Sequence, residues 1–271
     1  MTDASPPVPI VPNVAWQTRI ERAPPVEERK PFVVIRRQAA VATVTLSRPE
    51  KRNALGEEML AEFNDALASF GDDTETRVIV LSAEPPVFSA GAETNVKAGS
   101  SDADRRQAFA GRKSQFRRLF ERATTALESL EQVTVAKIGG HAVGAGWGLT
   151  LACDFRVASD AAQFWIPEVE LGVLLGVGTT TRLVRLVGPA KAKEIILLAR
   201  RHSAASLVEQ GLLTEVASPE DLDARTDALV EALVDKPFLP LAQMKSRIDH
   251  IARVGTPESA SVIETILSRG D

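Results

Sequence analysis

Two glycine-rich turns are the strongest candidates for a chemical site in this sequence. In the first, residues 88–93 (FSAGAE), Gly91 lies between two alanines after a strand-like run. Side chains no larger than a methyl group let the backbone pass close to a ligand. In the second, residues 139–148, five glycines lie between a strand-like run and a helix start, whose unpaired N–H groups suit an anionic oxygen. Taken alone, each turn is explained equally well as an ordinary bend.

Three common site motifs are missing from the sequence. The dinucleotide motif G-x-G-x-x-G fails in the second turn because Leu149 stands where the third glycine would be. No phosphate-binding motif G-x-x-x-x-G-K-[ST] occurs. The nucleophile motif G-x-S-x-G fails around Ser89 because Val87 stands where the first glycine would be. The sequence therefore disfavours a nucleotide-phosphate site and does not support a nucleophilic serine.

The composition is that of an ordinary globular protein, with 44% hydrophobic and 25% charged residues among 271. The net charge of −4 gives no electrostatic reason to expect a nucleic-acid partner. No apolar run reaches about eighteen residues, so we expect no membrane span. Cys153 is the single cysteine and no zinc-site spacing is present, so we expect no bound metal. Without a recognisable targeting signal, a reducing, cytoplasmic setting fits best.

Short strands alternate with helices between residues 32 and 188, which indicates an α/β core. The β-branched runs at 32–36 and 41–47 predict a hairpin, and apolar residues at helical spacing over 57–70 predict a helix after it. The same plan recurs less regularly further along. It consists of a strand at 78–82, a helix at about 104–131, a strand at 135–138, a short helix at 149–154 and a strand at 155–159.

The two ends of the chain differ from this core. Residues 1–31 contain seven prolines, and each ring removes an N–H donor, so we expect an extended or disordered arm. From residue 189 onward the strand signals stop and helical segments dominate. We therefore predict an arm over 1–31, a core with the active site over 32–188, and a helical C-terminal region over 189–271.

With both turns placed, the chain resembles the enoyl-CoA hydratase/isomerase family, the crotonases. The similarity covers roughly residues 32–268 and rests on several motifs in the family's order. They are RPEKRNAL (48–55), FSAGAE (88–93), HAVGAGWGLTLACDFRVAS (141–159), AQFWIPEVELG (162–172) and LVEQGLLTEV (207–216). The resemblance implies a spiral of strand–strand–helix turns that forms two roughly perpendicular sheets. It also implies C-terminal helices that assemble homotrimers, often paired as hexamers.

The resemblance further implies an acyl-CoA substrate, with CoA entering as part of that substrate and no separate cofactor. In the family, the thioester oxygen lies between two backbone amides, which correspond here to those of Ala92 and Ala145. The family commonly has glycine at the second position, but an amide donor survives a methyl side chain. Preorganised donors stabilise the negative charge that develops on this oxygen when the neighbouring carbon is deprotonated. We therefore expect an enzyme that forms a thioester enolate.

The carboxylates decide what happens to the enolate. Family hydratases use two glutamates, but here the first position is Gly148 and only the second is retained, as Glu168. Adding water is easiest with two carboxylates, whereas moving a double bond from the 3 to the 2 position needs one base. We therefore expect a 3-enoyl-CoA to 2-enoyl-CoA isomerase. The alternatives are hydration, decarboxylation, carbon–carbon bond chemistry or a catalytically silent acyl-CoA binder, and for Glu168 itself a surface ion pair.

The remaining candidates are assigned from their motif positions. Residues expected near CoA are Lys51, Arg52, Asn53, Ala54, Leu55, Ala90 and Lys97. Trp147 and Trp165 are candidates for walls of the acyl pocket, with core packing as the alternative. Structural roles are expected for Glu93, Asp154, His141 and Cys153, and a solvated strand position for Glu170.

Overall fold

The computed structural model describes residues 29–93, 101 and 113–254. The chain divides after Lys30, and the fold below is that of the unit that begins at Pro31. The strands and α-helices are β1 (Val33–Gln38), β2 (Val41–Leu46), α1 (Glu57–Ala68), β3 (Val78–Ala83), α3 (Lys113–Ser129), β4 (Val133–Ile138), β5 (Ala142–Val143), α4 (Ala145–Thr150), β6 (Phe155–Ser159), β7 (Gln163–Trp165), α5 (Val177–Leu198), β8 (His202–Ser203), α6 (Ala204–Glu209), β9 (Glu215–Ala217), α7 (Leu222–Val234) and α8 (Phe238–Val254). Most of the predicted arm and the first part of the helix predicted at 104–131 lie outside the described residues.

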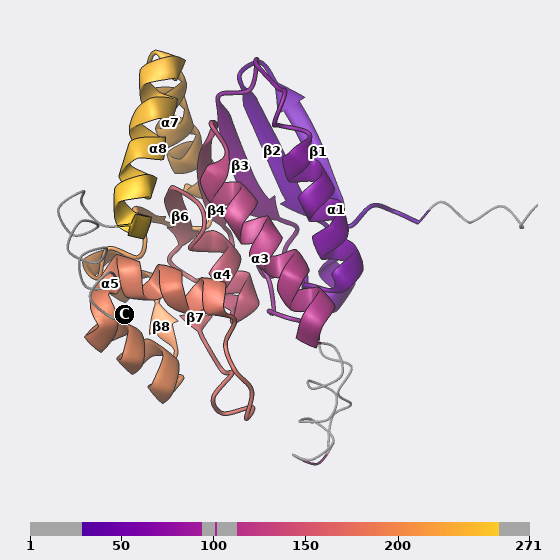
Figure 1. The fold of residues 1–271 in the computed structure, drawn as a ribbon, viewed down its shortest axis with the longest axis vertical. Coiled ribbons are helices and arrows are strands. Elements are labelled where there is room, and N and C mark those ends of the chain that lie inside the picture. Colours follow the sequence, from indigo (N-terminus) through magenta and orange to yellow (C-terminus); the bar gives the residue numbers. More distant parts are fainter. Residues whose placement is uncertain (1–28, 94–100, 102–112, 255–271) are drawn as a thin grey trace, which may run out of the picture. The chain divides into compact units, whose positions relative to one another are not determined.

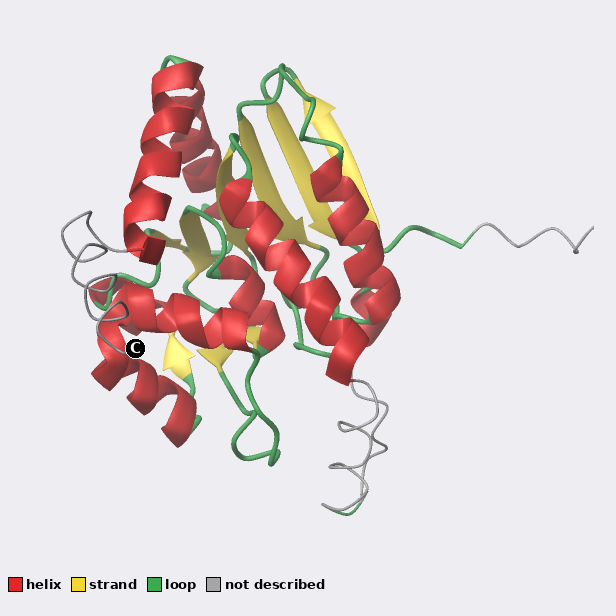
Figure 2. Ribbon diagram, viewed as in Figure 1, coloured by secondary structure: helices red, strands yellow, loops and turns green. Residues whose placement is uncertain are grey.

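Six strands form the main sheet, in the order β1-β2-β3-β4-β6-β9 (Figures 1 and 2). β1 and β2 are antiparallel, which confirms the predicted hairpin, and every later neighbour in the sheet is parallel. α1 confirms the helix predicted after the hairpin, since its apolar residues Met59, Leu60, Phe63 and Leu67 are all buried. The first strand–strand–helix unit therefore forms as its periodicity predicts.

Helices cover both faces of the main sheet, which explains why the central strands β3 and β4 are buried along nearly their whole length. α1 and α3 lie side by side across one face (Figure 1), where Phe63 and Leu127 share a core cluster with Ile79. On the other face, Val230 of α7 shares a second cluster with Val78. Successive residues of β3 thus point into two different cores, as strand geometry requires.

A second, smaller sheet of three strands positions the glycine-rich turn. Its order is β5-β7-β8, with β5 and β7 parallel and β7 and β8 antiparallel. β5 leads directly into α4, and β7 ends three residues before Glu168. Because β5 and β7 run in the same direction, the residues that follow them emerge at the same end of the sheet. This pairing brings the second glycine-rich turn and Glu168 together.

The short helix of the second turn differs from its prediction. The helix expected at 149–154 is α4, Ala145–Thr150, and residues 151–154 form a turn. Glycine disfavours helix by about 1 kcal/mol per residue, and a helix this short is not stable alone. All six residues of α4 are buried, however, so packing overrides the local preference.

The C-terminal region also differs from its prediction, because strands do not stop at residue 189. β8 and β9 both lie beyond it, and β9 pairs with β6 to extend the main sheet. The predicted boundary falls inside α5, at a kink where Gly188 has φ of 74° just before Pro189. Glu170 is exposed, as expected, but lies in a turn rather than in a strand.

Candidate active site

Backbone hydrogen bonds hold the two glycine-rich turns against each other. The amide of Phe88 donates to the carbonyl oxygen of His141 over 3.0 Å, and the amide of Val143 donates to that of Ser89 over 3.0 Å. Ser89 and Ala142 form an isolated parallel bridge. The two turns are far apart in the sequence, but these bonds place them next to each other in the fold.

Gly91 permits the closest approach of the two turns. Its φ is 92°, a conformation that other residues rarely adopt. A Cβ at this position would lie 2.9 Å from the carbonyl oxygen of Val143 and 3.7 Å from the amide nitrogen of Ala145. Any side chain here would push the turns apart, which is why the first turn places glycine next to Ala92.

The amides of Ala92 and Ala145 are oriented away from their own secondary structure. Leu55 is bonded to the residues on either side of Ala92, through the carbonyl of Gly91 and the amide of Glu93, so the amide of Ala92 faces the opposite way. Ala145 is the first residue of α4, where no intrahelical acceptor exists for its amide. Neither amide donates to another group within the described ranges. A role for these two amides in binding the thioester oxygen stays a prediction.

The carboxyl group of Glu168 lies against the residue that precedes Ala145. The turn that carries Glu168 is closed by the amide of Val173, which donates to the Glu168 carbonyl over 2.9 Å. The amide of Gly144 donates to Trp165 over 2.9 Å, and a Cβ on Gly144 would lie under 3.0 Å from Glu168 Oε1. Glycine at 144, with φ of 48°, is therefore what lets the carboxyl reach this place.

Burial raises the pKa of Glu168 to about 7. Its Oε2 is buried and has no hydrogen-bond partner in the part of the chain that the structure describes. A carboxylate is normally held ionised by donors or by a cation, and the described surroundings of Glu168 supply neither to Oε2. The group is therefore poised to exchange a proton near neutral pH, and a surface ion pair does not account for its position.

Gly148 leaves no room for a side chain. A Cβ there would lie under 3.0 Å from Thr179 Oγ1, 3.2 Å from Thr179 Cγ2 and 3.1 Å from Phe120 Cζ. The absence of a glutamate at 148 is visible in the sequence, but the approach of these two residues is not. Thr179 lies in α5 and Phe120 in α3, and no local pattern connects either to Gly148.

The residues expected near CoA separate into exposed and buried ones. Lys51, Arg52 and Ala90 are exposed, and the amide of Ala90 donates to the carbonyl of Arg52 over 2.9 Å. Asn53 is fully buried: its side chain accepts from the amide of Arg48 and donates to two carbonyl oxygens. Leu55 is also buried, and Ala54 is partly exposed. Lys97 lies outside the described residues.

The two tryptophans have different surroundings. Trp147 is fully buried and packs against Phe164, with 5.6 Å between ring centroids, and against His202, at 6.1 Å. Trp165 is partly exposed, and the guanidinium of Arg201 lies 4.6 Å from its ring centroid. Trp147 is therefore part of the core, and a role for either ring as a wall of the acyl pocket stays a prediction.

The other polar residues of these motifs have partners within the protein. Glu93 forms two hydrogen bonds with Arg48, of 2.8 and 3.1 Å. Asp154 accepts from the amide and hydroxyl of Thr134. His141 accepts from the amide of Gln163 over 3.1 Å. Cys153 is buried, and its burial raises the pKa of the thiol to about 12. These contacts fit the structural roles expected for all four.

None of the described helices is long and apolar enough to cross a membrane. Across residues 29–93, 101 and 113–254, no group of three or more His, Cys, Asp and Glu side chains could hold a metal ion.

Comparison with known proteins assigns the family. The family model described as enoyl-CoA hydratase/isomerase matches residues 36–267. A protein from Mycobacterium bovis named probable enoyl-CoA hydratase echA8 is 33% identical over 198 residues, covering 72% of this chain and 73% of the relative. A putative enoyl-CoA hydratase from Thermobifida fusca, solved in complex with CoA, is 30% identical with a TM-score of 0.71, covering 88% and 93% of the two chains.

A monofunctional enoyl CoA isomerase from M. smegmatis has a TM-score of 0.70 over 85% of this chain and 98% of its own, but at 24% identity this likeness shows the fold alone. The α/β crotonase-like fold expected from the sequence is confirmed. The chain belongs to the enoyl-CoA hydratase/isomerase family.

Proposed function

We propose that this protein is a 3-enoyl-CoA to 2-enoyl-CoA isomerase that uses Glu168 as its single base. The observation that carries the proposal is the state of the Glu168 carboxyl, which is buried beside the backbone of Gly144 with a pKa of about 7. The position of a second carboxylate, Gly148, has no side chain. One proton-transferring group matches a reaction that moves one proton within the substrate.

The reaction starts with the Glu168 carboxylate taking a proton from C2 of a 3-enoyl thioester. The C2–H bond breaks, and its electron pair delocalises through the C3–C4 double bond and onto the thioester oxygen. The amides of Ala92 and Ala145 donate hydrogen bonds to that oxygen, and one such donor lowers the barrier by roughly 3–4 kcal/mol. Glu168 then returns the proton to C4, which leaves the double bond between C2 and C3. No water or second base is consumed.

The CoA portion of the substrate is assigned to the segment beside the first turn. Lys51 and Arg52 are exposed cations, and the bond from the Ala90 amide to the Arg52 carbonyl holds them next to the turn that contains Ala92. Cations at this position suit the phosphates of CoA. The CoA complex of the Thermobifida fusca relative supports the same class of ligand. CoA thus enters as part of the substrate.

Hydration of 2-enoyl-CoA is the second candidate function, because several relatives carry the name hydratase. In that reaction Glu168 would activate water without a partner carboxylate. Addition of water to the β-carbon of a 2-enoyl thioester needs a base that deprotonates the water and an acid that protonates the α-carbon. One carboxyl that serves both roles makes hydration slower than isomerisation at this site.

The proposal is tested by offering matched 3-enoyl-CoA and 2-enoyl-CoA thioesters and following conjugated absorbance. We expect conjugation of the 3-enoyl substrate, and Glu168→Gln is expected to lower kcat by about 10²–10⁴-fold. Glu170→Gln is the matched control, because Glu170 is exposed in the same turn. A 3-enoyl substrate that never conjugates would refute the isomerase, and thioester binding without turnover of either substrate would identify a silent binder.

We also propose that the protein assembles with copies of itself, as a trimer or a pair of trimers. Met244, Ile248 and Ile251 of α8 are 54%, 59% and 40% exposed, and their spacing places them on one helix face. Apolar faces of this kind mark association surfaces. Sedimentation should show a trimer or hexamer that Ile248→Lys dissociates, whereas a monomer at micromolar concentration would exclude this assembly.

A further inference from the structure

Thr179 holds a buried hydroxyl at the place where Gly148 lacks a side chain. Thr179 is 1% exposed, and its Oγ1 has no hydrogen-bond partner in the described part of the chain. Other helical threonines donate to the carbonyl four residues earlier: Thr124 to Phe120 over 3.0 Å and Thr180 to Gly176 over 3.3 Å. Thr179 lies near the start of α5, where it makes no such bond. Local hydrogen bonding therefore does not explain a threonine here.

Steric contact with α4 does explain it. A Cβ on Gly148 would lie under 3.0 Å from Thr179 Oγ1, closer than real Cβ atoms approach a neighbour, and Thr179 Cγ2 would be at 3.2 Å. Phe120, 3% exposed, closes the same space from α3 with Cζ at 3.1 Å. Both neighbours are packed side chains, so neither can move aside freely. Any longer side chain at 148 would therefore overlap Thr179 from its first atom, the Cβ.

The same helix links this contact to the base. The amide of Gly148 donates to the carbonyl of Gly144 over 2.9 Å, so the two glycines are one helical turn apart. Glu168 lies against Gly144, and Thr179 lies against Gly148. The base and the threonine thus lie against two positions that are one helical turn apart at α4. A second acid or base aimed at the substrate from residue 148 would stand beside Glu168, and Thr179 fills the space where it would begin.

We propose that Thr179 determines the reaction of this site, because its side chain fills the place of a second carboxylate and restricts the protein to one-base chemistry. The proposal rests on the proposed isomerase function and deepens it. It assigns the effect to the volume of Thr179 rather than to its hydroxyl. Glutamate at 148 therefore cannot add hydration to the enzyme while Thr179 is present.

The kinetic test compares Gly148→Glu, Thr179→Gly and the double variant Gly148→Glu/Thr179→Gly with 2-enoyl-CoA. We expect the double variant to hydrate at least about tenfold faster than either single variant, since the two positions share one space. Gly148→Glu combined with Thr179→Val keeps the volume and loses the hydroxyl, and should stay as slow as Gly148→Glu alone. The proposal is wrong if Gly148→Glu alone hydrates as fast as Gly148→Glu/Thr179→Gly. It is also wrong if Gly148→Glu/Thr179→Val hydrates as fast as Gly148→Glu/Thr179→Gly.

A stability cycle tests the same space without any activity. Gly148→Ala should lower the Tm of the full chain by about 2–10 °C, as overpacking does, and by clearly less in the Thr179→Gly background. Thr180→Gly is the matched control, because it changes the next threonine of α5 and should give no relief. An equal loss in all backgrounds would overturn the proposal. Because this readout needs no substrate, it stands even if the wild-type protein proves not to be an isomerase.

Discussion

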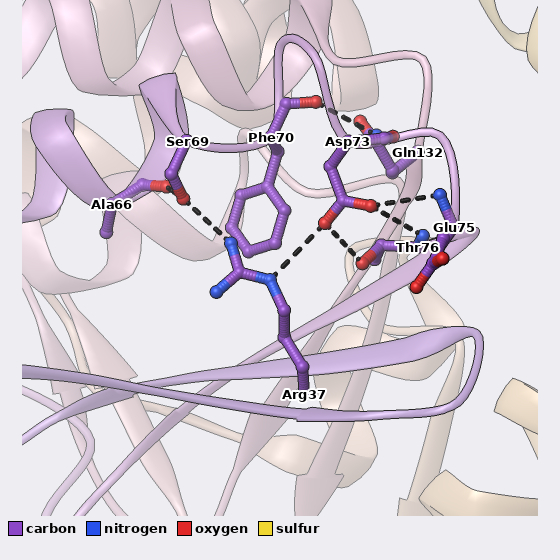
Figure 3. Close-up of polar contacts among 8 residues, drawn as sticks. All are labelled: Arg37, Ala66, Ser69, Phe70, Asp73, Glu75, Thr76 and Gln132. Atoms are coloured by element: carbon purple, nitrogen blue, oxygen red, sulfur yellow. Dashed lines mark hydrogen bonds and ion pairs between the residues drawn. The ribbon is translucent and has the colours of Figure 1, made fainter.

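Asp73 and Glu168 are two turn carboxylates of one protein, and their pKa values are shifted in opposite directions. Asp73 accepts from the amides of Glu75 and Thr76, at 3.0 and 2.9 Å, and from the Thr76 hydroxyl at 2.7 Å (Figure 3). Hydrogen bonds from Thr76 above all lower its pKa to about 2. Glu168 has a buried oxygen without a described partner, and burial raises its pKa to about 7.

The difference separates a structural carboxylate from a reactive one. Donors that stabilise a charge make a carboxylate a poor base, because the proton is then held weakly. Burial without donors makes it a stronger base, at the expense of stability, and such pairs of environments are how proteins assign acid–base roles. Every hydrogen bond to the Asp73 carboxyl comes from its own turn and from Arg37 of β1, whereas the carboxyl of Glu168 lies against Gly144, which is distant in the sequence.

The largest effect expected from this contrast between Asp73 and Glu168 is on the pH dependence of catalysis. Only ionised Glu168 can take a proton, so kcat for the 3-enoyl substrate should rise about tenfold per pH unit below pH 7 and level off above it. Between pH 7 and pH 5 this amounts to roughly a hundredfold. Initial rates across this range provide the measurement, with Asp73→Asn as a control that should keep the profile. A rate that is flat between pH 5 and 7 would contradict the role of Glu168.

The second prediction is that Glu168→Gln stabilises the fold at high pH. Because the folded-state pKa of about 7 is above the ordinary 4.5, the contribution of Glu168 is most favourable below pH 4.5 and is lost as pH rises to 7. Removing the charge should therefore raise the free energy of unfolding above pH 7 by up to roughly 3 kcal/mol relative to its effect at pH 4.5. Denaturant unfolding of both proteins at the two pH values measures it. A constant difference would show that Glu168 is not desolvated.

Asp73→Asn should have the opposite sign. The lowered pKa means that ionised Asp73 stabilises the fold above pH 3.8, and that this stabilisation is lost as pH falls to about 2. The amide keeps one acceptor but loses the charge, so we expect a loss of about 1–2 kcal/mol at pH 7, which disappears towards pH 2. The same unfolding experiment provides the measurement, and unchanged stability at pH 7 would end the contrast with Glu168.

Local patterns predicted those parts of the molecule that local forces determine. The hairpin of β1 and β2 and the buried stripe of α1 follow from residue periodicity. α4 was misplaced because burial, not propensity, stabilises its glycine-rich sequence, and β9 was missed because three residues carry too little pattern.

The candidate site likewise contains residues that local motifs predict and residues that only tertiary packing brings together. Glu168, Ala92 and Ala145 are candidates from the sequence because each lies in a recognisable motif. Thr179 is not one, because it meets Gly148 only through the packing of α5 against α4. The network of Asp73 was missed for a similar reason: Gln132, which donates to the carbonyls of Phe70 and Asp73, arrives from the start of β4 (Figure 3).

The smallest expected effect concerns Arg37, the only cation drawn beside Asp73 in Figure 3. Its Nε donates to Asp73 over 3.3 Å and its Nη2 to Ser69 over 2.9 Å, but its side chain is 44% exposed. Exposed ion pairs contribute little, so Arg37→Lys should change the free energy of unfolding by less than about 1 kcal/mol.

The pKa of Asp73 should also stay well below its ordinary value in Arg37→Lys, because the bonds from Thr76 lower it most. An NMR titration of the Asp73 carboxyl in both proteins measures this directly. A return of the pKa towards 4 would mean that the cation, rather than the turn, keeps Asp73 ionised. The contrast with Glu168 would then lie in a nearby charge, and placing a cation beside Glu168 would be the way to abolish its basicity.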